Sequence, residues 1–336
     1  MNKFRAVLAI DGGGIRGLFA ASVLAAVERM IGKPLGQTFD LVAGTSTGGI
    51  IALAAGAGLP MADIAALYRT RAATIFHRSP WHALATGGGL WGPRYDGKGL
   101  AAALAEAFGD RSLAGIGGRV LVTAYDLERR KPHFFKSWKA REDADEDFRL
   151  LDAALATSAA PVYFPPASIR PCGHAKESYH YRGVCLPLAS IRPQGGGGAL
   201  TLIDGGIGNN NPSLCALAEA GKLWPEPVLL LSVGSGVSEQ PYFHASGWGL
   251  AGWAAPLLDC MFDAQSDTAA YVCGLQLGRN HLRINCVLPC DIPMDSSNPD
   301  ALRSLEYLAE AVVEGRRAEI ERLIELLGYR GRQWTA

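Results

Sequence analysis

FRAVLAIDGGGIRGLFAASVLAAVERM, residues 4–30 of a chain of 336, is the stretch that decides the fold. Residues 4–10 form an apolar run that predicts a buried strand, and the glycine cluster that follows predicts a tight loop. Residues 18–30 have the Ala- and Leu-rich composition of a helix. The same order of strand, turn and helix returns at once in residues 39–57. Two strands that each lead into a helix favour a parallel sheet.

The predicted elements alternate in this way along the rest of the chain. Strands are predicted at residues 4–10, 39–43, 119–125, 133–138, 199–203, 228–233 and 281–287. Helices are predicted at residues 18–30, 50–57, 148–156 and 299–327. We therefore expect an α/β fold in which helices cover a central sheet.

Composition limits the classes of function. Hydrophobic residues make up 49% of the chain and charged residues 19%, which supplies enough apolar material for a large core. The 32 basic residues balance 32 acidic ones, so no overall charge favours a nucleic acid polymer as partner. Seven scattered cysteines fit a reducing compartment better than a disulfide framework. The N-terminal apolar run is too short for a secretory signal, and we expect a cytoplasmic protein.

The first chemical motif is Gly44-Thr45-Ser46-Thr47-Gly48, a G-x-S-x-G match between a predicted strand and a predicted helix. Glycines flank the serine of such a turn because neighbouring segments approach too closely for a β-carbon. The turn presents the hydroxyl at the edge of the sheet, and the amino terminus of the following helix favours developing negative charge. Ser46 is therefore a candidate nucleophile.

The glycine cluster at residues 11–17, DGGGIRG, is the second candidate site. It matches the G-x-G-x-x-G loop of dinucleotide-binding proteins, but that loop needs an acidic residue about 20 positions further on, at the end of the second strand. Glu28 lies within a predicted helix and Asp40 at the start of the next strand, so neither meets this need. We favour a row of backbone N–H donors facing an oxyanion, with Arg16 adding positive charge, over a purely structural turn.

Asp204-Gly205-Gly206 is the third motif, and it directly follows the strand predicted at residues 199–203. A carboxylate at a strand end can accept a proton, and the glycines after it allow close approach to another loop. Taken alone, such an aspartate more often caps the next turn, which here is residues 209–212.

In this order, the three motifs resemble those of the patatin-like phospholipase family. Residues 11–17 are similar to its anion-binding glycine loop, residues 44–48 to its nucleophile turn and residues 204–206 to its catalytic aspartate motif. Residues 156–161, ATSAAP, also look typical of the family.

The resemblance carries expectations for the fold. It covers roughly residues 7–218 and implies three α/β/α layers around a mostly parallel sheet. We expect residues 1–336 to form one domain, in which residues 219–336 add strands and C-terminal helices to the core that carries the motifs.

The resemblance also implies lipid-ester hydrolysis by a Ser–Asp dyad without a histidine. Asp204 takes the proton of Ser46, and the amides of the glycine loop bind the oxyanion. The implied oxyanion residues are Gly12, Gly13, Gly14 and Arg16, and the other motif glycines are Gly17, Gly44, Gly48, Gly205 and Gly206. No metal and no cofactor is implied. Because a carboxylate is a weak base in water, an apolar acyl pocket must raise the proton affinity of Asp204.

Residues 131–138, KPHFFKSW, and the compact length of the chain resemble the bacterial phospholipase effectors of anti-phage signalling systems. Those enzymes are switched on by cyclic dinucleotides and degrade the membrane phospholipids of their own cell. The resemblance therefore implies a phospholipid substrate, a cyclic dinucleotide activator, peripheral contact with the inner membrane in the active state and a capacity to form homo-oligomers. The sequence does not locate a nucleotide pocket.

Two other functions stay open. A Ser–His–Asp triad of the α/β-hydrolase type could use His244 or His281, which follow Asp204 in the chain. A non-catalytic protein could instead use the loop at residues 12–17 to bind a phosphate ligand and leave Ser46 inert.

Residues 171–198 look inserted relative to the family pattern. The pentapeptide ASIRP occurs at residues 167–171 and again at 189–193. Four potential zinc ligands fall in this region, Cys172, His174, His180 and Cys185, but their spacing matches no common zinc pattern. No metal site is predicted from them.

Tryptophans in Gly-rich, charge-poor segments form the last group of interest: Trp81, Trp91, Trp248 and Trp253. Core packing is their expected role. A second interpretation is an interfacial lid, because indole suits the boundary between water and a membrane. Residues 81–93, which carry two of them, are long for an ordinary connection.

Overall fold

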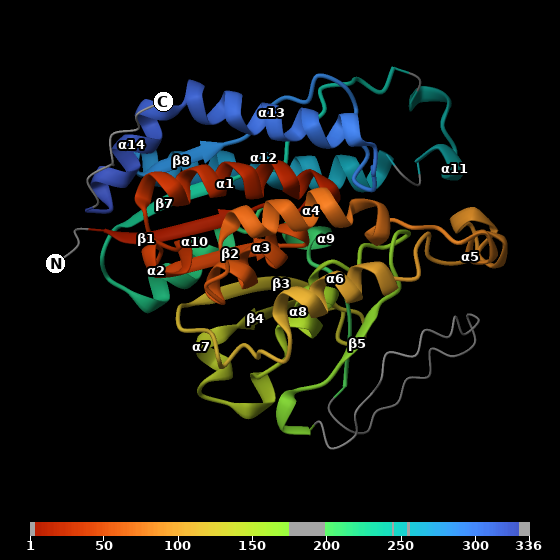
Figure 1. Cartoon of the computed structure of the whole chain (residues 1–336), viewed down its shortest axis with the longest axis horizontal. Coiled ribbons are helices and arrows are strands. Elements are labelled where there is room, and N and C mark those ends of the chain that lie inside the picture. The colour runs from red at the N-terminus through yellow and green to blue at the C-terminus, as the bar shows by residue number, and fades with distance from the viewer. Residues whose placement is uncertain (1–3, 175–198, 244, 254–255, 329–336) are drawn as a thin grey trace.

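The computed structural model describes residues 4–174, 199–243, 245–253 and 256–328 (Figure 1). A sheet forms its centre, with strands β1 Arg5–Ile10, β2 Leu41–Thr45, β3 Val120–Asp126, β4 Lys131–Lys136, β5 Ala167–Ile169, β6 Leu200–Asp204, β7 Val228–Val233 and β8 His281–Ile284. Hydrogen bonds connect the strands in the order β5-β6-β3-β2-β1-β7-β8, and β4 also pairs with β3. The section β3-β2-β1-β7-β8 is parallel throughout, whereas β4, β5 and β6 pair in antiparallel fashion.

The antiparallel strands bring the end of β6 to the end of β2. β2 pairs with β3 as far as Thr45, which lies opposite Thr123. β6 pairs with the next part of β3, where Asp204 lies opposite Ala124. β4 occupies the other edge of β3 over this whole stretch, so β2 and β6 lie one after the other along the same edge of β3. Because they run in opposite directions, their carboxyl ends point at each other. The residue after Thr45 therefore lies beside Asp204.

Helices connect and cover the strands. They are α1 Gly17–Ile31, α2 Leu35–Thr38, α3 Thr47–Gly56, α4 Met61–Ile75, α5 Pro80–Ala85, α6 Lys98–Phe108, α7 Ser137–Ala140, α8 Leu150–Thr157, α9 Gly206–Asn209, α10 Ser213–Leu223, α11 Leu250–Trp253, α12 Pro256–Leu277, α13 Pro299–Gly315 and α14 Arg317–Leu326. None of the helices in the described ranges has both the length and the apolar character needed to span a bilayer.

Helix boundaries follow local chemistry. α1 ends where Gly32 adopts a left-handed conformation (φ 74°) and donates its N–H to the Glu28 carbonyl, the usual C-terminal role of glycine. α13 begins with Pro299 after Asn298, whose side chain accepts from the Asp300 N–H. Its apolar stripe packs on α1.

The alternation of side chains in β1 separates two cores and so defines three layers. Leu8 and Ile10 are fully buried in a large core together with residues of α1, α3, α8 and α13. Val7 and Ala9 point the other way, into a smaller core with residues of α10 and α12. The expected three-layer α/β/α fold with a mostly parallel sheet is confirmed (Figure 1).

Most predicted strands coincide with observed ones, and β7 agrees at both ends. The strand predicted at residues 133–138 ends earlier, at Lys136, because α7 begins at Ser137, whose side chain bonds the chain at the start of β3. Its hydroxyl accepts from the Val120 N–H and donates to the Gly118 carbonyl. β5 was not predicted, although it contains part of the first ASIRP copy. The second copy, at residues 189–193, lies outside the described residues.

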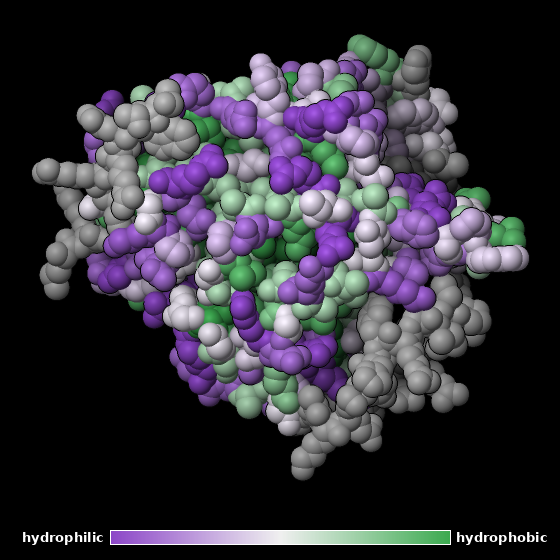
Figure 2. Space-filling model, in the orientation of Figure 1, coloured by the Kyte–Doolittle hydropathy of each residue, from purple (hydrophilic) through white to green (hydrophobic). Residues whose placement is uncertain are grey.

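Residues 78–95, which contain α5, project from the body at the end of the molecule opposite the amino terminus (Figure 1). Figure 2 shows apolar surface at the tip of this projection and hydrophilic surface next to it. Trp81 and Trp91 are 81% and 77% exposed, so the prediction of core packing is wrong for them. Trp253 is exposed as well, and Trp248 is half-buried against its ring.

Candidate active site

Ser46 occupies the sharp turn between β2 and α3. Its backbone has φ 55° and ψ −124°, an unusual conformation for a residue with a side chain. A β-carbon on Gly44 would lie 2.0 Å from the Gly48 carbonyl oxygen, and one on Gly48 would lie 2.2 Å from the Ile10 carbonyl oxygen. Both motif glycines are therefore required by the close approach of backbone segments, as the sequence predicts.

Thr157, the last residue of α8, holds the turn in place. Its hydroxyl accepts a hydrogen bond from the Ser46 N–H at 2.8 Å and donates one to the Thr123 carbonyl at 2.7 Å. Thr157 is fully buried, so its hydroxyl bridges two backbone groups that would otherwise be buried without a hydrogen bond. The ATSAAP segment thus supports the nucleophile turn, a role that its sequence did not reveal.

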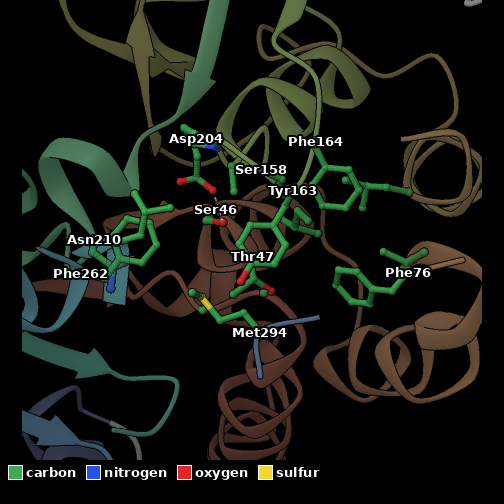
Figure 3. Close-up of a pocket in the computed structure, with 18 of the residues that line it drawn as sticks. Ser46, Thr47, Phe76, Ser158, Tyr163, Phe164, Asp204, Asn210, Phe262 and Met294 are labelled. Carbon is green, nitrogen blue, oxygen red and sulfur yellow. Dashed lines mark hydrogen bonds between the residues drawn. The ribbon is translucent and has the colours of Figure 1, made fainter. Parts of the chain in front are cut away.

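The Ser46 hydroxyl donates to Asp204 Oδ2 at 2.6 Å (Figure 3). The other carboxylate oxygen, Oδ1, accepts from the Gly206 N–H at 2.7 Å. Ser46 is 9% exposed and Asp204 2% exposed. The structure therefore brings together the two residues that the sequence selected from positions 158 residues apart.

Burial raises the pKa of Asp204 to about 7, although the hydrogen bonds from Ser46 and Gly206 act in the opposite direction. The dominant cause is desolvation, since the charged form loses its contact with water. A carboxyl group with this pKa is a far better proton acceptor than an exposed aspartate, and it is still largely ionised slightly above neutral pH.

The glycine loop presents two free amides to the site rather than three. The Gly12 N–H already donates to the Asn210 carbonyl at 3.0 Å, so Gly12 is not an oxyanion donor and that expectation is corrected. Gly13 and Gly14 both line the cavity, and their N–H groups have no hydrogen-bond partner within the described part of the chain. Gly14 has φ 58°, and a β-carbon there would lie 2.3 Å from the Met294 carbonyl oxygen.

Arg16 is not among the residues that line the cavity, although the resemblance implies that it supplements the oxyanion hole. Its positive charge lies beside α12, where burial raises the pKa values of Asp259 and Asp263 and Arg16 partly offsets this rise. The carboxylates of Asp259 and Asp263 on α12 attract the positive charge of Arg16.

The remaining motif glycines mark close contacts around the pair. A β-carbon on Gly17 would lie 2.1 Å from Thr47 Oγ1, which fixes the spacing between α1 and α3. A β-carbon on Gly205 would lie 2.2 Å from Thr123 Oγ1, so glycine is needed where the chain leaves β6 against β3. Gly206 supplies the N–H that binds Asp204.

A largely apolar cavity opens beside the Ser46–Asp204 pair (Figure 3). Its apolar walls include Ile50, Ile75, Phe76, Leu100, Phe164 and Phe262. Tyr68 lies at the cavity with its hydroxyl bonded to Thr47, and burial raises the pKa of this phenol well above its usual value. The Ser158 hydroxyl is buried at the cavity wall without a partner in the part of the chain that is described. Such a cavity suits a long hydrocarbon chain whose polar end lies at Ser46.

Histidines are placed away from this pair. His281 shares a hydrogen bond of 3.0 Å with Ser232, and burial lowers its pKa to about 4. No histidine of the described residues lines the cavity. His244, the other triad candidate, lies outside the described residues, as do His180 and Cys185 of the potential zinc ligands. Within the described ranges, no group of His, Cys, Asp or Glu side chains could hold a metal ion.

A buried ion pair that sequence analysis missed anchors the glycine loop. Arg283 on β8 donates to both carboxylate oxygens of Asp11, the first residue of the loop. Ser235 adds a hydrogen bond of 2.7 Å to the Gly12 carbonyl. The sequence contains no signal for either contact, because these residues follow the loop by more than 200 positions.

Together, the three-layer fold, the serine at a strand-to-helix turn and the bound carboxylate define the class of serine acyl hydrolases. A family model described as patatin-like phospholipase matches residues 8–217. The chain belongs to the patatin-like phospholipase family, whose members are lipid acyl hydrolases.

Relatives in bacteria and plants support this assignment. The chain is 30% identical over 313 residues to the "cGAMP-activated phospholipase" of Pseudomonas aeruginosa, an alignment that covers 90% of this chain and 81% of that protein. It is 36% identical over 232 residues to the protein of the same name from Vibrio cholerae, with coverages of 63% and 57%. It is 26% identical over 354 residues to "Patatin-like protein 4" of Arabidopsis thaliana, with coverages of 92% and 83%.

Proposed function

We propose that this protein is a phospholipase that hydrolyses phospholipid esters through a Ser46–Asp204 dyad. The observation that carries the proposal is the hydrogen bond of 2.6 Å between the serine hydroxyl and a buried carboxylate, next to a largely apolar cavity. Membership of the patatin-like phospholipase family supports the same chemistry.

Acylation begins when Ser46 Oγ attacks the ester carbonyl carbon and its proton passes to Asp204 Oδ2. The carbonyl oxygen becomes an oxyanion that the amides of Gly13 and Gly14 stabilise by hydrogen bonds. As this intermediate collapses, the bond to the alkoxide breaks and Asp204 returns the proton to the leaving alcohol. The products of this half-reaction are a lysophospholipid and an ester between the acyl chain and Ser46.

Deacylation repeats the same steps with water in place of serine. Asp204 takes a proton from water while the resulting hydroxide attacks the acyl carbon, and the same amides hold the second oxyanion. When the bond to Ser46 breaks, Asp204 returns the proton to the serine oxygen. A free fatty acid leaves, and both side chains regain their starting state.

We further propose that a cyclic dinucleotide activates this enzyme. Two relatives carry the name "cGAMP-activated phospholipase", and one of them aligns with 90% of this chain. The motif resemblance to effectors of anti-phage signalling supports the same control. An activator must bind the active conformation more tightly than the inactive one.

Fatty-acid release from phospholipid vesicles tests both proposals. Wild-type enzyme, Ser46→Ala and Asp204→Asn are compared with and without a panel of cyclic dinucleotides that includes cGAMP. We expect release only from the wild type and an increase of about tenfold or more with one nucleotide. Activity in either variant would refute the dyad, and equal rates under all nucleotide conditions would refute the activation.

A further inference from the structure

We propose that residues 78–95 form a docking projection that inserts into an anionic phospholipid membrane and positions lipid at the mouth of the active-site cavity. This inference rests on the proposed phospholipase function and adds the surface by which the enzyme meets its substrate. The partner of the projection is a lipid surface.

The docking projection exposes large apolar side chains to solvent. Trp81 is 81% exposed, Leu84 75%, Leu90 82% and Trp91 77%. Single exposed apolar residues are normal, but a group of them on one protruding element marks an interaction site. Indole rings are well suited to the interface of a bilayer, because they combine an apolar body with one N–H donor.

Hydrogen bonds within the projection give it a defined local structure. The Ser79 hydroxyl accepts from the His82 N–H, and the Thr86 hydroxyl donates to the His82 carbonyl at 2.9 Å. The Trp91 N–H donates to the Thr86 carbonyl at 2.9 Å, and Trp91 lies against Gly87. The backbone groups of the turn are thus satisfied within the projection, and its apolar side chains remain outside.

The charge of the projection favours a negatively charged partner. The sequence contains no aspartate or glutamate between Asp63 and Asp96. Arg78 is exposed, donates only to the Gly88 carbonyl and has no carboxylate partner among the residues of known placement. A cation next to exposed indoles complements the phosphate layer and the interfacial region of an anionic bilayer.

Both ends of the projection lie next to residues that line the active-site cavity. Phe76, which precedes it, lines the cavity and packs on Tyr95 with ring centroids 5.4 Å apart. The Tyr95 N–H donates to the carbonyl of Tyr163, another lining residue, at 2.9 Å. Phe164 completes this aromatic group at 5.6 Å from Tyr95. A membrane that receives the tip therefore lies next to the cavity wall.

The opposite wall of the cavity continues into apolar surface as well. Leu258 lines the cavity, while its neighbour Leu257 is 49% exposed and Phe243 is 82% exposed. Asp295 ties this side to the projection, because its carboxylate accepts from Arg94 and from the Tyr95 hydroxyl, each at 2.7 Å. A phospholipid held at this surface would place its acyl chain in the largely apolar cavity beside Ser46.

Vesicle flotation with the double variant Trp81→Ser/Trp91→Ser tests the proposal. The Ser46→Ala background prevents hydrolysis, and vesicles contain phosphatidylcholine alone or with phosphatidylglycerol, each with and without cGAMP. We expect the double variant to reduce vesicle binding about tenfold or more, and Arg78→Glu to reduce binding only to the anionic vesicles. Tyr307→Ser is the matched control, because this aromatic residue on α13 is 71% exposed and is not among the residues that line the cavity.

Hydrolysis by enzymes with an intact Ser46 separates docking from catalysis. We expect the double variant to lose vesicle hydrolysis while it cleaves a water-soluble monomeric ester within about twofold of the wild-type rate. An equal loss on the soluble ester, unchanged vesicle binding, or an effect on self-association alone would overturn the proposal. If the wild type cleaves neither substrate but still needs the two tryptophans to bind vesicles, only the proposed catalytic function fails.

Discussion

Arg283 on β8 holds Asp11 through both carboxylate oxygens, at 2.8 Å and 2.5 Å, and so fixes the point at which β1 enters the glycine loop. Asp11 is 2% exposed, and no other cation contacts its side chain in the described structure. The pair joins two strands of the sheet on either side of β7. Its position suggests that the fold, rather than the loop alone, sets the direction of the Gly13 and Gly14 amides.

Replacing Arg283 by methionine should leave the Asp11 carboxylate buried without a partner. We expect a loss of about 3–5 kcal/mol in the free energy of unfolding, measured by urea denaturation. The double variant Asp11→Asn/Arg283→Met should recover a large part of this loss, because it removes the unpaired charge. Equal stabilities for the single and double variants would contradict the importance of the ion pair.

Gly14→Ala should damage the oxyanion site directly. The new β-carbon would clash with the Met294 carbonyl oxygen, and the residue would keep a positive φ. We expect kcat on a soluble ester to fall about 100-fold or more. Gly58→Ala is the matched control, because Gly58 also has a positive φ (74°) but has open space around it. A similar loss of activity in both variants would show that backbone strain alone is responsible.

Thr157→Val should weaken the nucleophile turn without changing the shape of the side chain. The Ser46 N–H and the Thr123 carbonyl would lose their shared partner, at a cost of about 1–3 kcal/mol in stability. We expect kcat to fall more than KM changes, because the position of Ser46 is affected and the acyl pocket is not. Thr70→Val on α4 removes an exposed hydroxyl that bonds within its own helix and serves as control. Wild-type kinetics for Thr157→Val would contradict this role.

Activity should depend on the ionisation of Asp204. Because burial raises its pKa to about 7, the base is protonated and inactive at lower pH. We expect kcat/KM for a soluble ester to rise with pH through about 7 and then level off. A profile that is flat between pH 5 and 8 would show that another group accepts the proton.

The same shift predicts how stability depends on pH. The pKa of Asp204 is higher in the folded state than in the unfolded state, so the folded protein binds this proton more tightly. The stability that proton binding contributes is therefore present at low pH and is lost as the pH rises to about 7. Asp204→Asn, which is neutral at every pH, should therefore stabilise the protein at pH 8 by up to about 4 kcal/mol. Below about pH 4 the advantage should vanish. Thermal unfolding at the two pH values measures this difference.

The local patterns of the sequence were enough to predict the parallel sheet and Ser46 as a candidate nucleophile, whereas the pairing of Ser46 with Asp204 was implied by the resemblance to the patatin-like phospholipase family. Strand-to-helix turns rich in glycine have few alternative structures, and the register that brings β6 to β2 follows once both motifs lie at strand ends. Arg283 and Thr157 could not be predicted in this way. Their roles depend on which backbone groups lie nearby in space, and a single arginine or threonine carries no local signal for that.

Two of the expectations that failed did so for physical reasons that the sequence does not show. Gly12 was expected to donate to an oxyanion, but the turn after β6 places the Asn210 carbonyl within 3.0 Å of its N–H. Core packing was the expected role of Trp81 and Trp91, with an interfacial lid as the second interpretation. The polar groups of their turn are satisfied internally, and this leaves the indoles free to face solvent.

Labelling by a fluorophosphonate, followed by mass spectrometry of the modified peptide, tests the central claim most directly. We predict that the wild-type protein is labelled at Ser46. The Asp204→Asn variant, with unchanged circular dichroism, should react at a rate at least about 100-fold lower. Labelling of a different serine, or labelling of Asp204→Asn at the wild-type rate, would contradict the assignment of Ser46 and Asp204 as a catalytic pair.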